Sequence, residues 1–145
     1  MRCRVWPELT MRCSAISPTG GQNRGTDPRR SLVRCVIVDD SRAFRESARR
    51  LLEFGGADIV GMASNSADAR ASVDELHPDV TLVDVHLGAE SGFDLARELA
   101  SGTAVILTST APETDLAERI AASPARGFVP KAALSVGAIQ ELLRA

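Results

Sequence analysis

The sequence lacks the features that mark several classes of protein. Its 145 residues contain no apolar run of the ~20 residues that a membrane-spanning helix needs, and no apolar signal-peptide core. Its three cysteines form neither a CxxC pair nor a cluster with histidine, so we expect no zinc site and no disulfide framework. We therefore expect about one domain's length of cytoplasmic protein with reduced thiols.

Lysine is nearly absent, and the charges are unevenly distributed. Of 17 basic residues, 16 are arginines, and the single lysine, Lys131, lies in a mostly apolar stretch. Residues 1–34 hold seven arginines and two acidic residues (net +5), whereas residues 35–145 hold ten basic and seventeen acidic residues (net −7). An acidic body argues against direct binding of nucleic acid.

The first part of the chain differs in composition from the rest. Residues 1–33 are rich in Arg, Gly, Ser, Thr and Pro and show no helical or strand periodicity. This composition predicts a disordered, basic N-terminal extension, followed by one folded domain over residues 34–145. A transit peptide and an over-long translation start are two further interpretations of the extension.

Short apolar runs alternate with amphipathic segments through the rest of the chain. Five runs predict strands buried in a sheet, at residues 35–38, 58–63, 80–83, 104–108 and 127–130. Five helical patterns follow them, at residues 42–54, 66–76, 92–100, 113–122 and 134–144. Five βα units predict a doubly wound α/β fold. We expect a flavodoxin-like (βα)5 three-layer sandwich with a parallel sheet of order 2-1-3-4-5.

Polar residues stand where the predicted strands end. Asp39 and Asp40 follow the first strand, Asp84 follows the third, Thr108 ends the fourth and Lys131 follows the fifth. In this fold a ligand crevice opens at the carboxyl ends of the first and third strands. We therefore expect these five side chains to converge on one edge of the sheet.

These groups together predict metal-assisted phosphoryl transfer. Three adjacent carboxylates repel one another, and oxygen ligands favour Mg²⁺, which with Lys131 would balance their charge. A phosphoryl group could then bind, and a carboxylate is the expected nucleophile because no Ser/His or Cys/His pair lies at this edge. Taken singly, each residue has a plainer interpretation as a helix cap, a turn residue or a surface charge. Their joint order along the strands favours a site.

The motifs VIVDDS, PDVTLVDVHLGAESGFDL, VILTST and GFVPKAAL resemble those of response-regulator receiver domains of two-component signalling, over residues 35–145. The resemblance implies that Asp84 accepts a phosphoryl group from a histidine kinase or a phosphotransfer protein. It implies Mg²⁺ as the cofactor, held by Asp39, Asp40, Asp84 and the backbone carbonyl of His86.

The resemblance also implies a switch. Thr108 and Lys131 would contact the phosphoryl group, and Phe128 would be the aromatic switch residue. The face formed by the last two helices and the last strand would then signal to an unknown downstream protein or form a homodimer. The chain would catalyse only its own phosphorylation and dephosphorylation. His86 and Thr110 either tune hydrolysis or are exposed loop residues.

The sequence departs from the family at two positions. Gly88 stands where the family usually has proline, and Ala132 follows Lys131 where proline is frequent. The KAAL segment resembles receivers that carry a helix-turn-helix output domain. We expect a stand-alone receiver, because the last predicted helix ends the sequence.

Other functions remain as alternatives to a phosphorylated receiver. A phosphorylation-independent binding module would keep only the fold, without using the acidic trio. A Mg²⁺-dependent phosphatase usually has a second aspartate two residues after the nucleophile, where this sequence has His86. A dinucleotide carrier is disfavoured because no GxGxxG follows the first strand.

Overall fold

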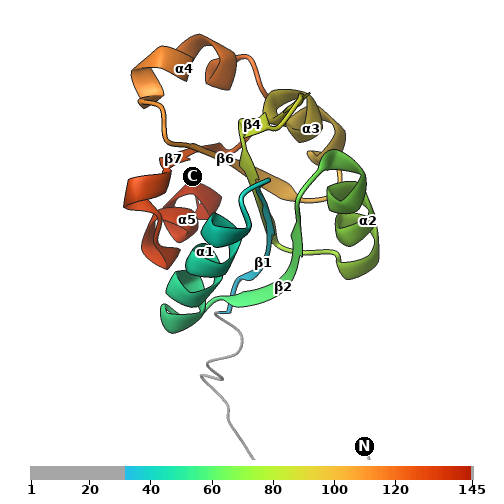
Figure 1. Cartoon of the computed structure of the whole chain (residues 1–145). Helices are drawn as coiled ribbons and strands as arrows, with labels where there is room; N and C mark the ends of the chain where they lie inside the picture. The colour runs from blue at the N-terminus through green and yellow to red at the C-terminus, as the bar shows by residue number, and fades with distance from the viewer. Residues whose placement is uncertain (1–31, 145) are drawn as a thin grey trace, which may run out of the picture. The chain divides into compact units, whose positions relative to one another are not determined.

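The computed structural model describes residues 32–144, so all but the last two residues of the predicted extension lie outside the described part. Five parallel strands form one sheet in the order β2-β1-β3-β6-β7 (Figure 1). They are β1 (Arg34–Val38), β2 (Asp58–Ala63), β3 (Val80–Asp84), β6 (Ala104–Ser109) and β7 (Gly127–Pro130). This is the predicted order, since β4 (His86–Leu87) and β5 (Glu90–Ser91) form a separate hairpin.

Helices cover both faces of the sheet, as predicted for a doubly wound fold. They are α1 (Arg42–Phe54), α2 (Ser66–Leu76), α3 (Gly92–Leu99), α4 (Glu113–Ala121) and α5 (Val136–Arg144). In Figure 1, α1 and α5 lie on one side of the sheet and α2 and α3 on the other. Buried side chains of α4 join those of α2 and α3 in one hydrophobic cluster, whereas α1 and α5 share the second cluster.

Alternation along each central strand supplies both clusters. In β1, Cys35 and Ile37 face α1 and α5, whereas Val36 and Val38 face α2 and α3. All four are at most 1% exposed. Because both faces are covered, these strands appear in the sequence as continuous apolar runs rather than as alternating patterns.

The structure corrects several details of the sequence prediction. The last helix begins at Val136 rather than at residue 134, because Lys131–Ala133 first form a short 3₁₀ helix. Although apolar, Leu51 of α1 is 47% exposed, whereas Ala48 and Leu52 are buried. These two residues are four apart and so lie on one face of α1, which packs on the sheet.

The hairpin after β3 was not predicted. It pairs His86 with Ser91 and Leu87 with Glu90 around a two-residue turn. Gly88 begins this turn at φ 61°, in the left-handed region that glycine adopts readily. Proline, whose φ is fixed near −65°, could not take this conformation. The departure from the family pattern therefore matches the local backbone.

Gly92 allows α3 to begin directly against the end of β3. A Cβ atom at this position would lie 2.0 Å from the carbonyl oxygen of Asp84, and the Gly92 amide donates to Val85 at 2.9 Å. Any side chain here would push α3 away from the backbone that carries the Asp84 carboxylate.

We expect Gly92→Ala to lower the free energy of unfolding by about 1–3 kcal/mol, because backbone must shift to admit the methyl group. Urea unfolding monitored by circular dichroism measures this loss. Gly102→Ala is the control, since its Cβ would meet Val73 at an ordinary 3.5 Å. Equal losses in the two variants would contradict the steric argument.

Candidate metal centre

Asp39 is held tightly at the end of β1. It is 1% exposed, and its amide donates to the carbonyl of Ala63 in β2 at 3.0 Å. The amide of Ser41 donates to its Oδ1 at 2.8 Å, and Arg45 of α1 donates to its backbone carbonyl at 2.6 Å. The second carboxylate oxygen is thereby left to face the edge of the sheet. Asp40, the next residue, is exposed.

Asp84 ends β3, the strand beside β1. It is 6% exposed, and its Oδ1 accepts a hydrogen bond from the amide of His86 at 3.3 Å. In the sheet its neighbour is Thr108 of β6, whose carbonyl accepts from the amide of Val85. Adjacent parallel strands therefore place the Asp84 carboxylate and the buried Thr108 at the same edge.

Lys131 enters from the end of β7 as the first residue of the 3₁₀ helix. Its Nζ lies 2.6 Å from Oδ2 of Asp39 and 3.3 Å from Oδ2 of Asp84, and its side chain is 15% exposed. The ammonium group thus links the carboxylates that follow two different strands.

The donor set fits a hard divalent cation. Carboxylate oxygens of Asp39, Asp40 and Asp84 lie within 4.8 Å of one another. Within residues 32–144, Oδ2 of Asp39 is a buried oxygen without a hydrogen-bond partner, although the Lys131 ammonium faces it as an ion pair. Buried polar atoms are normally hydrogen-bonded. Apart from this ion pair, Oδ2 is available to a ligand, and with the two neighbouring carboxylates it offers the oxygen coordination that Mg²⁺ prefers.

The electrostatics of the cluster follow from burial and crowding. Burial raises the pKa of Asp84, and the charge of Asp39 raises it further, while Lys131 and the His86 amide lower it in part. Burial acts to lower the pKa of Lys131, but its contacts with Asp39 and Asp84 outweigh burial and raise it. The charged form of Asp84 is therefore unfavourable in the metal-free fold.

The unfavourable charge on Asp84 predicts that the metal-free wild type and an Asp84→Asn variant differ in stability, and that this difference depends on pH. Because the folded-state pKa of Asp84 lies above 3.8, deprotonation destabilises the fold at neutral pH, and the penalty vanishes below 3.8. We expect Asp84→Asn to be more stable than the wild type at pH 7 in chelator, with the difference shrinking as the pH falls toward 4. Urea titrations at several pH values check this. A difference that grows on acidification would contradict it.

The other residues singled out from the sequence lie around this cluster. Thr108 and Ser109 at the end of β6 are buried, and the Ser109 hydroxyl accepts from the amide of Ala111. Phe128 in β7 is 8% exposed and packs in the hydrophobic cluster that contains buried side chains of α2, α3 and α4. His86 and Thr110 are exposed. The structure fixes these positions, while their parts in a phosphorylation switch stay predictions.

The first turn of α1 makes contacts beside this cluster, and the sequence did not indicate the one between Phe44 and Lys131. Ser41 caps α1 by accepting from the amide of Phe44 at 3.2 Å. The Phe44 ring lies under the Lys131 ammonium, with Nζ 4.3 Å from the ring centroid. The sequence could not reveal this contact, because Lys131 is far from Phe44 along the chain.

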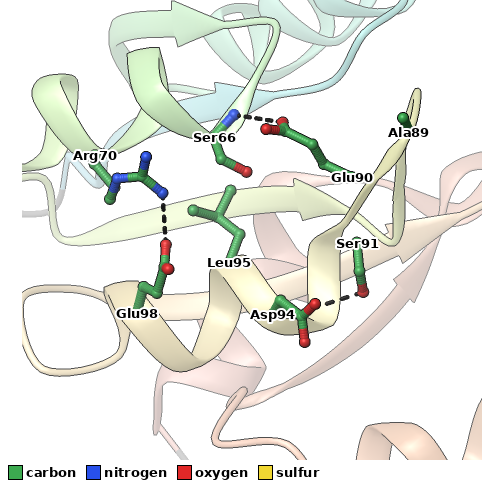
Figure 2. A pocket seen from close by; sticks show the side chains of 8 residues that line it. All are labelled: Ser66, Arg70, Ala89, Glu90, Ser91, Asp94, Leu95 and Glu98. Atoms are coloured by element: carbon green, nitrogen blue, oxygen red, sulfur yellow. Dashed lines mark hydrogen bonds and ion pairs between the residues drawn. The ribbon is translucent and has the colours of Figure 1, made fainter.

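A polar groove of about 320 Å³ lies elsewhere, between α2, the β4–β5 hairpin and α3. Figure 2 shows Glu90 reaching toward Ser66 and Arg70 toward Glu98. Glu90 accepts from the Ser66 amide at 2.9 Å, Arg70 pairs with Glu98 at 2.6 Å, and Asp94 pairs with Arg97. Since these charges already have partners, the groove is a structural contact between elements rather than a second reactive site.

Comparison with known proteins identifies the family that has this fold and this carboxylate cluster. The family model described as "Response regulator receiver domain" matches residues 35–144, so the chain belongs to the response-regulator receiver family of two-component signalling. The predicted family is therefore confirmed. Within residues 32–144, no helix is both long enough and apolar enough to cross a membrane.

Individual relatives place the chain within this family. It is 35% identical to the response regulator MprA of Mycobacterium sp. (strain KMS) over 103 residues, which cover 68% of this chain and 44% of that protein. It is 36% identical over 92 residues to "Protein-glutamate methylesterase/protein-glutamine glutaminase 5" of Myxococcus xanthus, covering 60% of this chain. The match spans only 26% of that relative's length, so the activity given in the relative's name is not assigned to this chain.

Solved structures agree with the fold. The receiver domain of the putative response regulator NarL from Mycobacterium tuberculosis superposes with a TM-score of 0.70 at 29% identity, covering 79% of this chain and 98% of that one. A LuxR-family response regulator from Aurantimonas sp. SI85-9A1 gives 0.71 at 26% identity, covering 79% and 86%.

Proposed function

We propose that the chain is a phosphorylation-dependent response regulator whose Asp84 accepts a phosphoryl group from a histidine kinase or a phosphotransfer protein. The observation that carries this proposal is the position of Lys131, whose Nζ contacts both Asp39 and Asp84. A fold-only binding module would have no need to gather a lysine and three carboxylates at one edge of the sheet.

The proposed reaction is an in-line displacement at phosphorus. A carboxylate oxygen of Asp84 forms the new O–P bond while the P–N bond of the donor phosphohistidine breaks, and the electron pair stays on the donor nitrogen. The His86 amide holds one oxygen of Asp84 in place. The Lys131 ammonium contacts the Asp84 carboxylate. Its positive charge would therefore also lie close to the phosphoryl oxygens after transfer and would stabilise their negative charge.

Asp39, Asp40, Asp84 and the carbonyl of His86 would hold Mg²⁺. When bound, it would neutralise the carboxylates and the charge that develops on the phosphoryl oxygens. Asp39 is suited to this role because Ser41 and Arg45 already fix its carboxylate and backbone. Its Oδ2, which faces the Lys131 ammonium in the metal-free fold, is the oxygen that would turn to the ion.

The output is proposed to pass through Thr108 and Phe128. Thr108 lies beside Asp84 in the sheet, and Phe128 stands one strand further along, in β7. Rearrangement of these residues on phosphorylation would reshape the α4–β7–α5 face toward a downstream cytoplasmic partner or a second copy of the chain.

Nuclear magnetic resonance of the single lysine tests this function. Because Lys131 is the only lysine in the sequence, labelling lysine with ¹³C at Cε gives one side-chain carbon signal. We expect that signal to move when Mg²⁺ and beryllofluoride are added together, and not with beryllofluoride alone. The exposed Asp74→Asn variant should behave like the wild type, whereas Asp84→Asn should not respond. An unmoved signal in the wild type would favour the phosphorylation-independent binding module.

A further inference from the structure

The aromatic ring of Phe44 forms part of the surroundings of Lys131. Nζ lies 4.3 Å from the ring centroid, within the range of a cation–π contact. The same nitrogen pairs with Asp39 and Asp84. The ammonium group thus has carboxylates at one side and an aromatic face at another.

The position of the ring is tied to the carboxylate cluster through the N-cap of α1. The Ser41 amide donates to Oδ1 of Asp39, the Ser41 hydroxyl accepts from the amide of Phe44, and the Phe44 ring contacts Lys131. Lys131 in turn pairs with Oδ2 of Asp39. These contacts form a cycle that begins and ends at Asp39. The first turn of α1 and the Lys131 side chain therefore hold each other in position.

We propose that Phe44 is a positioning residue for phosphoryl transfer, because its π face holds the Lys131 ammonium between the two aspartates. This inference rests on the proposed function and extends it by a residue outside the charged set. An aliphatic side chain would fill the same space and contact the same core. It would not attract the ammonium, which could then turn toward solvent.

Resonances of the lone lysine test the geometry without metal or phosphodonor. The ring current of Phe44 should displace the εCH₂ signals of Lys131 upfield in the metal-free wild type, and Phe44→Leu should return them to the position of a solvated lysine. Lysine signals that are already at the solvated position in the wild type would overturn the proposal.

A series of fluorinated phenylalanines at position 44 tests the electrostatic contribution. Adding one, two and then three fluorines weakens the negative face of the ring with little change in its shape. We expect the rate of phosphorylation by acetyl phosphate to fall stepwise, by about three- to tenfold over the series. The free energy of unfolding should change little. A rate that stays constant across the series, with a loss only in Phe44→Leu, would show that Phe44 acts through packing alone and would overturn the proposal.

The two proposals fail separately. If the wild type is not phosphorylated at all while its lysine signals are displaced by the ring, the proposed function fails and the Phe44–Lys131 contact stands. If the wild type is phosphorylated normally and the fluorine series has no effect, Phe44 loses its positioning role and the proposed function stands.

Discussion

Asp84→Asn is expected to reduce incorporation of a phosphoryl group from acetyl phosphate by roughly 100-fold or more, since the nucleophilic oxygen is replaced by a neutral amide. The fold should survive the change. Asparagine has nearly the same shape, and it relieves the repulsion between Asp84 and Asp39. Intact-protein mass spectrometry over time measures the incorporation.

The control for this variant makes the same chemical change away from the cluster. Asp74 is an exposed residue of α2, and Asp74→Asn should be phosphorylated at the wild-type rate. Persistent labelling of Asp84→Asn would place the nucleophile on Asp39 or Asp40 instead. Loss of labelling in both variants would point to a general defect rather than to Asp84.

Lys131→Ala is expected to lower the phosphorylation rate by roughly 100-fold, because it removes a positive charge aimed at the transferred group. It should also lower the free energy of unfolding by about 1–3 kcal/mol in the absence of metal. The physical reason is that Asp39, which is 1% exposed, loses the cation that faces its Oδ2. Rates come from mass spectrometry and stabilities from urea unfolding.

A surface ion pair supplies the matched control. Arg42 and Glu46 lie four residues apart on α1, and the Arg42 side chain is 82% exposed. Arg42→Ala should change the stability by no more than about 0.5 kcal/mol and leave the phosphorylation rate unchanged. If Lys131→Ala matched this control in both measurements, the lysine would have no part in holding the aspartates or the phosphoryl group.

The strand order could be predicted because its determinants are local and repeated. Central strands such as β1 and β3 are buried on both faces, and the amphipathic helices between them require a parallel, right-handed arrangement. The hairpin formed by His86–Leu87 and Glu90–Ser91 was missed because strands of two residues leave no periodic pattern. The late start of α5 was missed because the helical pattern continued through the 3₁₀ turn.

The convergence of Asp39, Asp84 and Lys131 was also predictable, since parallel strands direct their carboxyl ends to one edge. The finer environment was not. The contact between the Phe44 ring and the Lys131 ammonium depends on how α1 packs in the finished fold. It joins residues that are distant in sequence and leaves no local signal, whereas the cap of Ser41 lies within the first turn of α1 and does leave one.

The most direct test of the central claim is to identify the phosphorylated residue. The wild-type chain is incubated with acetyl phosphate, with and without Mg²⁺, and then treated with borohydride, which converts an aspartyl phosphate to homoserine. Peptide mapping by mass spectrometry should find homoserine at position 84, and only in the sample that contained Mg²⁺. Homoserine at another aspartate, or none in the presence of Mg²⁺, would contradict the assignment of Asp84 as the phosphoacceptor.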